Sequence, residues 1–219
     1  MSAPERDRRL SQLVEALAED PHAPTAITDP AEAMDRHVAD SLSGLEVSAL
    51  TGAARICDIG SGAGFPGLPL AIALPDTSVD LVEANRRSCE AIERLIAAVG
   101  LSNARVVCER AEDWRRGADR YEAVTARALA PLAVLVEYAA PLLAPGGVLV
   151  AWKGRRNGEE EAAGAEAAAE VGLEPRLVKE VTPFAAARHR NLHVFQKVEQ
   201  TPDRFPRRAG IAAKRPLSR

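Results

Sequence analysis

Apolar residues recur every three or four positions over residues 5–19, which predicts an amphipathic helix near the start of the chain. A second helix is predicted over residues 30–43, because Asp29 is a suitable N-cap and Pro30 suits the first helical turn. Residues 1–50 are therefore expected to form a helical cap.

From Arg55 onward, short apolar runs alternate with longer helical patterns. Strands are expected over residues 55–60, 79–84, 104–110, 123–128, 146–154, 176–181 and 191–198. This alternation is typical of a parallel sheet with helices on both faces. The last two strands have no helix between them, so we expect them to form an antiparallel edge. We predict a seven-stranded, mostly parallel α/β domain over residues 51–198, followed by a basic extension over 199–219.

The net charge of −3 conceals a strong asymmetry along the chain. From Phe184 onward there are nine Lys or Arg residues against Glu199 and Asp203, a local charge of +7, which leaves −10 for residues 1–183. Clustered cations suit phosphate groups, so this segment can be a nucleic-acid contact. A solvated basic tail explains the same charge equally well.

Composition and cysteine usage disfavour several classes of protein. The N-terminus is charged where a signal peptide needs an apolar block, and no apolar run is long enough to span a bilayer. We therefore expect a cytoplasmic protein without a membrane partner. We also expect it to be a monomer. Cys57, Cys89 and Cys108 are odd in number and lack metal-ligand spacing, so we expect small buried side chains, no disulfide and no metal site.

The segment "DIGSGAGFPG" begins within the first expected strand, continues beyond it, and contains the strongest chemical signal. In a doubly wound sheet this turn lies at the ligand-binding edge, and Gly60, Gly62 and Gly64 allow close approach of the backbone. Glu83 ends the second strand, where a carboxylate can hold a ribose hydroxyl. Asp58 favours a cationic, amine-bearing ligand such as S-adenosyl-L-methionine over the pyrophosphate of NAD. NAD remains the alternative.

Three cations are expected at the same edge. Arg127 ends the fourth strand, Lys153 ends the fifth, and Arg190 begins the last strand, which starts at this edge if it is antiparallel. This edge is therefore expected to be positively charged.

An ordered set of motifs runs through most of the chain: "RHVADSL", "DIGSGAGFPGLPLAI", "LVEANRR", "RAED", "ARALAPL", "WKG", "RNLHVF" and "RFPRRAGIAAKRPL". This set resembles the glucose-inhibited division protein B family, the small-subunit rRNA guanine-N7 methyltransferases. The resemblance implies a Rossmann-like class I fold that uses S-adenosyl-L-methionine. It also implies methylation of N7 of a specific guanosine in the 16S rRNA of the small ribosomal subunit. Guanine N7 has a free lone pair, so methyl transfer to it needs positioning rather than a general base. Arginine is a natural donor to N7 and O6 of guanine.

The resemblance implies roles for individual residues as well. In addition to Asp58, Gly62, Gly64 and Glu83, it places in the cofactor pocket Gly60, Phe65, Ala111, Glu112 and Arg127. Arg190 is the expected catalytic residue, which orients guanine or stabilises the transition state. The expected RNA contacts are Lys153, Arg155, Arg190, Arg207 and Arg208.

His37 and Asp40 lie three residues apart on one helical face, and we expect a structural pair that links this helix to the domain. Two other functions remain open. An NAD-dependent oxidoreductase would require a catalytic acid or base at the rim, and none is evident at the strand ends. A non-catalytic RNA-binding protein could retain the donor pocket and transfer nothing.

Overall fold

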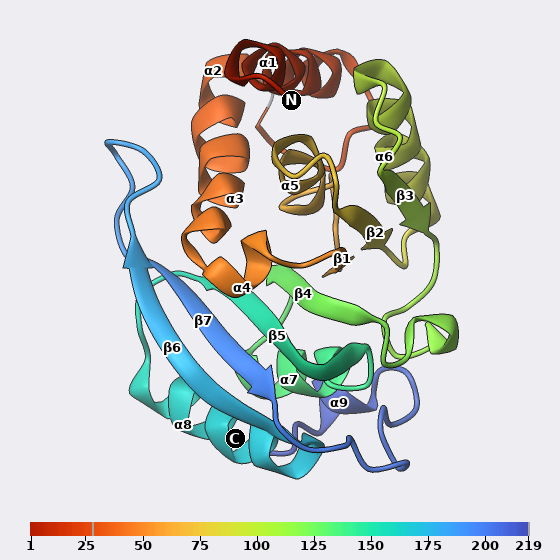
Figure 1. The fold of residues 1–219 in the computed structure, drawn as a ribbon, viewed down its shortest axis with the longest axis vertical. Helices are drawn as coiled ribbons and strands as arrows, with labels where there is room; N and C mark the ends of the chain where they lie inside the picture. Colours follow the sequence, from red (N-terminus) through yellow and green to blue (C-terminus); the bar gives the residue numbers. More distant parts are fainter. Residues whose placement is uncertain (28, 219) are drawn as a thin grey trace.

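The computed structural model describes residues 1–27 and 29–218, which form three layers, with one sheet between two layers of helices (Figure 1). Thr28, within the predicted cap, and Arg219, at the end of the predicted extension, lie outside the described residues. The strands are β1 (Arg55–Ile59), β2 (Ser78–Val82), β3 (Ala104–Val107), β4 (Tyr121–Arg127), β5 (Leu143–Lys153), β6 (Leu173–Val181) and β7 (Arg190–Lys197). Their order across the sheet is β3-β2-β1-β4-β5-β7-β6.

Strand β7 runs antiparallel to both of its neighbours, β5 and β6. The pairs β1–β2, β1–β4, β2–β3 and β4–β5 are parallel. The predicted seven-stranded, mostly parallel sheet with an antiparallel edge is therefore confirmed. Antiparallel pairing starts β7 at the edge where the parallel strands end, which brings Arg190 to that edge.

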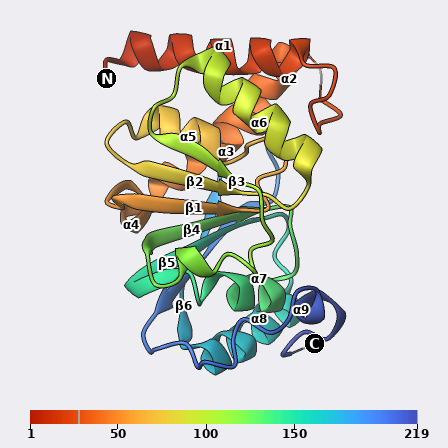
Figure 2. The same ribbon diagram turned by 90° about the vertical axis from the view of Figure 1, so that its right-hand side faces the viewer.

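Helices cover both faces of the sheet (Figure 2). On the face that carries the N-terminus lie α1 (Ala3–Glu19), α2 (Pro30–Ala33), the π-helix η1 (Met34–Ala39), α3 (Asp40–Leu42), α5 (Gly67–Ala73) and α6 (Arg86–Val99). On the other lie α7 (Leu132–Ala139), α8 (Gly158–Val171) and α9 (Ile211–Lys214). Short turns η2 (Ser43–Glu46), α4 (Ser48–Thr51) and η3 (Arg115–Gly117) complete the elements. Within the described ranges, no helix is long and apolar enough to cross a membrane.

The predicted helix over residues 30–43 contains a wider π-helical segment in its middle. It begins as expected, since the Asp29 carboxylate accepts a hydrogen bond from the Glu32 backbone N–H at 2.8 Å. The π-helical turns then cover Met34–Ala39 before α3 resumes the ordinary spacing. Such segments are frequent at functional sites.

Cys89, in the first turns of α6, forms a disulfide with Cys108, which follows β3; their Cα atoms are 5.9 Å apart. The expectation of no disulfide is therefore wrong. Spacing along the sequence did not reveal the pair, because the packing of α6 beside β3 brings the two residues together. Cys57 is free and buried, as expected of a small core side chain.

The basic C-terminal segment, residues 201–218, folds back against α7 and α8, and α9 lies beside them (Figure 2). Phe205 and Ala212 are buried in the apolar cluster that fills this side of the sheet. The interpretation of this segment as a solvated tail is therefore wrong.

Gly44, in η2, lies against the ring of Trp152, which is itself buried. A Cβ atom at Gly44 would lie 2.6 Å from Trp152 Cη2 and 3.0 Å from Leu50 Cδ2. We expect Gly44→Ala to lower the free energy of unfolding by about 1–3 kcal/mol, because this core cannot expand without strain.

Gly52→Ala is the matched control, because its nearest atom would be 3.5 Å away. Urea unfolding of both variants measures the difference, and we expect the control to change by less than about 0.5 kcal/mol. Equal losses in the two variants would contradict the packing argument.

Candidate active site

The loop between β1 and α5 lies at the carboxyl edge of the sheet. Gly60, Gly62 and Gly64 have φ angles of 65°, 57° and 92°, in the left-handed region that glycine adopts most readily. The Gly60 N–H donates to the Val82 carbonyl at 2.8 Å, and the Gly62 N–H donates to Glu83 Oε2 at 2.9 Å. The loop is thus fastened to the end of β2.

Asp58 lies beneath this loop and is 0% exposed. Its carboxylate accepts hydrogen bonds from the Gly67 N–H at 3.1 Å and the Thr125 hydroxyl at 2.8 Å. Burial raises its pKa to about 6, although these hydrogen bonds act in the opposite direction. Asp58 therefore holds β1, β4 and the start of α5 together, and it does not line the pocket beside Gly60.

A cavity of about 170 Å³ opens beside the loop, between the ends of β2 and β3 and one side of α7. We call it the acidic pocket; its lining residues are Gly60, Val82, Glu83, Ala84, Glu109, Arg110, Ala111, Glu112, Leu129 and Tyr138. It brings together four of the residues expected to bind the cofactor: Gly60, Glu83, Ala111 and Glu112.

Sequence reasoning missed Leu129 and Tyr138 in this pocket. Leu129 covers the loop so closely that a Cβ on Gly60 would lie 2.5 Å from Leu129 Cδ1. Burial, and then the charge of Glu112, raise the pKa of Tyr138 to about 12, so its hydroxyl remains neutral at neutral pH. Leu129 belongs to the "ARALAPL" block, but no pattern indicated which side of α7 faces the pocket.

A second cavity, of about 380 Å³, lies at the ends of β4 and β5 and the start of β7. We call it the basic pocket; its lining residues are Arg36, His37, Asp40, Arg127, Ala128, Trp152, Lys153, Gly154 and Arg190. The three cations expected at one edge, Arg127, Lys153 and Arg190, all line it. With Arg36, four cationic side chains surround the single carboxylate of Asp40, so the pocket is positively charged.

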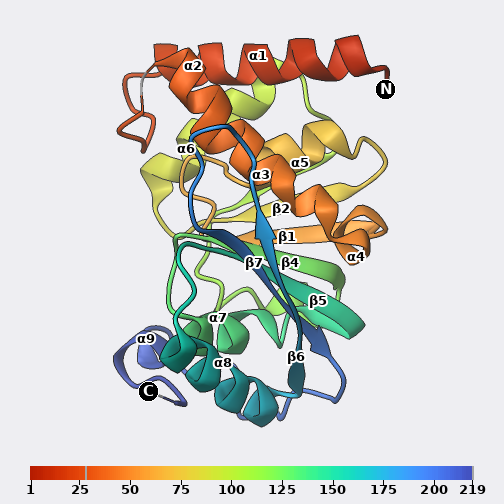
Figure 3. The same ribbon diagram turned by 90° about the vertical axis from the view of Figure 1, so that its left-hand side faces the viewer.

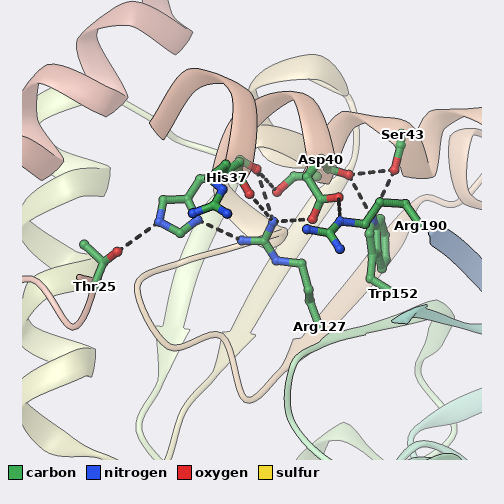
Figure 4. Close-up of polar contacts among 9 residues, drawn as sticks. Thr25, His37, Asp40, Ser43, Arg127, Trp152 and Arg190 are labelled. Carbon is green, nitrogen blue, oxygen red and sulfur yellow. Dashed lines mark hydrogen bonds and ion pairs between the residues drawn. The ribbon is translucent and has the colours of Figure 1, made fainter. Parts of the chain in front are cut away.

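Arg127 is held firmly within this pocket (Figure 4). Its Nη1 donates to Asp40 Oδ2 at 2.9 Å and to the backbone carbonyl of His37 at 3.3 Å. Its guanidinium carbon lies 5.6 Å from the centre of the Phe65 ring, within range of a cation–π interaction. The Arg127 side chain is 13% exposed. Arg127 is therefore a fixed cation rather than a mobile one.

His37 lies between Arg127 and Thr25. Arg127 Nη2 is 3.3 Å from His37 Nδ1, and arginine can only donate, so Nδ1 must be the unprotonated nitrogen. The proton then lies on Nε2, which donates to Thr25 Oγ1 at 2.9 Å. The ring stacks on Phe65 with centroids 4.6 Å apart. Burial, together with the charges of Arg127 and Arg36, lowers the pKa of His37 to about 4.

Arg190 is held less tightly than Arg127. Its Nε is 3.3 Å from Asp40 Oδ1, and its side chain is 36% exposed. Among residues 1–27 and 29–218, Asp40 Oδ1 is a buried side-chain oxygen that accepts no hydrogen bond. The connection from β6 to β7 passes α3 (Figure 3), and Arg190 is the first residue of β7. Asp40 and His37 thus do link their helix to the domain, and they also form part of the pocket, which the sequence did not indicate.

The other expected RNA contacts differ in their surroundings. Lys153 Nζ pairs with Glu160 Oε1 at 2.6 Å, which partly neutralises it inside the pocket. Arg155 is exposed, and its Nη2 lies 3.0 Å from His189 Nε2. Arg207 and Arg208 lie on the C-terminal segment and do not line the basic pocket. The Arg207 guanidinium is committed to Glu137, with Nε 2.8 Å from Oε1, whereas Arg208 is exposed.

The strand order and the pockets at the carboxyl edge define a class I methyltransferase fold. The aminoglycoside resistance methyltransferase NpmB1 has a similar solved structure, with a TM-score of 0.54 and 26% sequence identity over 71% of this chain and 93% of that one.

The family model described as rRNA small subunit methyltransferase G matches residues 7–192. A ribosomal RNA small subunit methyltransferase G of Chloroflexus aggregans is 45% identical over 196 residues, which cover 88% of this chain and 82% of the relative. The protein of that name from Desulfitobacterium hafniense is 39% identical over 196 residues, with 88% and 81% coverage. The chain therefore belongs to the rRNA small subunit methyltransferase G family, and the resemblance seen in its motifs is confirmed.

The environment of His37 predicts a particular pH dependence of stability. Its pKa of about 4 in the folded protein lies below the ordinary value of 6.5, so folding favours the neutral ring. The resulting stabilisation is complete above pH 6.5 and is lost as the pH falls toward 4.

His37→Phe keeps the stack on Phe65 and removes the titration. We expect its free energy of unfolding to fall less steeply than that of the unmodified protein between these pH values, by roughly 1–3 kcal/mol for this half-buried group. Urea unfolding across the pH range measures the slope. His22→Phe, at an exposed position, serves as the control, and equal slopes for all three proteins would contradict the prediction.

Proposed function

We propose that this protein transfers a methyl group from S-adenosyl-L-methionine to N7 of a guanosine in the 16S rRNA of the small ribosomal subunit. The observation that carries the proposal is the adjacency of the two pockets. Leu129 lines the acidic pocket, and its neighbour Ala128 lines the basic one. A donor in the first pocket and a base in the second would meet at this boundary. The family's name, rRNA small subunit methyltransferase G, supports the same reaction.

The residues of the acidic pocket fit the methyl donor. Glu83 offers a carboxylate to ribose hydroxyls, with its own orientation fixed by the backbone N–H groups of Gly62 and Asn85. Val82 and Leu129 provide apolar surface for a flat ring. The negative charge of the pocket suits a ligand whose sulfonium and amine are positive. When bound, S-adenosyl-L-methionine supplies an electrophilic methyl group.

The basic pocket suits a guanine within polyanionic RNA. Arg190 is exposed enough to donate to guanine O6 while N7 stays free, and we propose it as the catalytic residue that orients the base. Arg127, already paired with Asp40, lines the basic pocket where it adjoins the donor pocket. Lys153 and Arg155 then supply positive charge for neighbouring phosphates.

The family assignment does not favour an NAD-dependent oxidoreductase. A direct test uses small ribosomal subunits from cells that lack the protein, with methyl-labelled S-adenosyl-L-methionine and mapping of the labelled nucleoside. We expect 7-methylguanosine at one position of 16S rRNA. Label on another atom would contradict the N7 assignment. Donor binding without any transfer would favour the non-catalytic RNA-binding function instead.

Arg190→Ala tests the catalytic assignment. We expect kcat to fall by about tenfold to a hundredfold, because the guanine loses its orientation, while the Kd for S-adenosyl-L-methionine stays within about twofold. Calorimetry measures donor binding and methyl incorporation measures kcat.

Arg188→Ala is the matched control, since Arg188 is exposed and its guanidinium donates only to nearby backbone carbonyls, such as that of Ala185, in the described structure. Loss of donor binding in Arg190→Ala would instead move this residue into the cofactor pocket.

A further inference from the structure

The C-terminal segment, residues 201–218, contacts the rear of the acidic pocket. Phe205 is buried against the same apolar cluster as α7, and Thr201 donates its hydroxyl to the Val171 carbonyl at 3.0 Å. The segment therefore packs as an integral part of the domain.

An ion pair of low exposure anchors this segment to α7. Glu137 has a side chain that is 1% exposed, and Arg207 binds it through two parallel contacts, Nε to Oε1 at 2.8 Å and Nη2 to Oε2 at 2.5 Å. The same Nη2 donates to the Arg215 carbonyl at 2.9 Å, which closes the segment on itself. A carboxylate buried this deeply requires such a partner. The next residue of α7, Tyr138, lines the acidic pocket.

A second contact reaches the pocket wall itself. The backbone N–H of Gly210 donates to Glu112 Oε1 at 2.8 Å, and Glu112 is a buried lining residue of the acidic pocket. Gly210 has a φ of 79°, a conformation that places this N–H without strain only at glycine. The position of the Glu112 side chain thus depends on a residue almost one hundred positions away in the sequence.

We propose that the C-terminal segment is a brace for the donor pocket, and that Arg207 is a positioning residue for S-adenosyl-L-methionine. Arg207 fixes the segment on Glu137, and the fixed segment holds Glu112 and the adjoining face of α7 in the geometry that receives the donor. Such outer contacts commonly set ligand affinity through preorganisation. The inference rests on the proposed function, because it assigns the acidic pocket to the methyl donor.

The brace predicts a specific kinetic signature. We expect Arg207→Ala to raise the KM for S-adenosyl-L-methionine by about tenfold, with kcat at saturating donor and the KM for small subunits each within about twofold. Arg207→Lys, which keeps the charge, should recover part of the donor affinity. Arg204→Ala is the control, because it removes an exposed ion pair with Glu170 and a cation–π contact with Phe205 of the same segment without touching Glu112.

Three outcomes would overturn the proposal. An unchanged donor KM in Arg207→Ala removes the brace while leaving the proposed function intact. A raised KM for small subunits with an unchanged donor KM assigns Arg207 to RNA binding. If the unmodified protein neither binds the donor nor transfers methyl groups, the proposed function fails and the brace has no ligand.

A second measurement uses the unmodified protein and is independent of how well the variants fold. If the segment stabilises the donor site, the donor must stabilise the segment by the same free energy. We expect saturating S-adenosyl-L-methionine to slow amide hydrogen exchange in residues 203–214, including Gly210, and to leave α1 unaffected. Unchanged exchange in residues 203–214 at saturating donor would overturn the brace.

Discussion

The arrangement of the site depends on the ion pairs that the Asp40 carboxylate forms with Arg127 and Arg190. Buried between Arg127 and Arg190, Asp40 pairs with a guanidinium from the end of β4 and another from the start of β7. Its backbone carbonyl accepts a hydrogen bond from Trp152 Nε1 at 2.8 Å. One helical residue thus ties the N-terminal cap to three strands. Without it, the Arg127 guanidinium, which is 13% exposed, would lose the carboxylate that neutralises it, which is strongly unfavourable.

A comparable constraint acts on the donor side. Asp58 joins β1 to β4 and to the first residue of α5 from beneath the glycine loop, while Glu83 joins the loop to the end of β2. Both carboxylates are oriented by donors of the chain itself. The loop is therefore shaped before any ligand arrives, as preorganised binding requires.

The parts that were predictable from sequence are those that depend on strand ends. Parallel strands end at one edge, so the meeting of Arg127 and Lys153 followed from the alternating pattern alone. The position of Asp40 could not be predicted from this pattern, because it depends on how a helix with a π-helical segment is rotated against the sheet. The sequence did not predict the Cys89–Cys108 pair or the Arg207–Glu137 pair either, because each joins elements that only tertiary packing brings together.

The same contacts that stabilise the junction also favour a particular acceptor atom. The Nδ1 lone pair of His37 is occupied by Arg127, its Nε2 proton is donated to Thr25, and the carboxylate of Asp40 is shared by two arginines. Both ring nitrogens of His37 are thus engaged, and the Asp40 oxygen that accepts no hydrogen bond within the described residues, Oδ1, is buried beside Arg190. Methylation of an exocyclic amine or a ribose hydroxyl requires loss of a proton, which a general base would normally accept. Guanine N7 presents a free lone pair, so a pocket whose potential bases are already engaged favours transfer to N7.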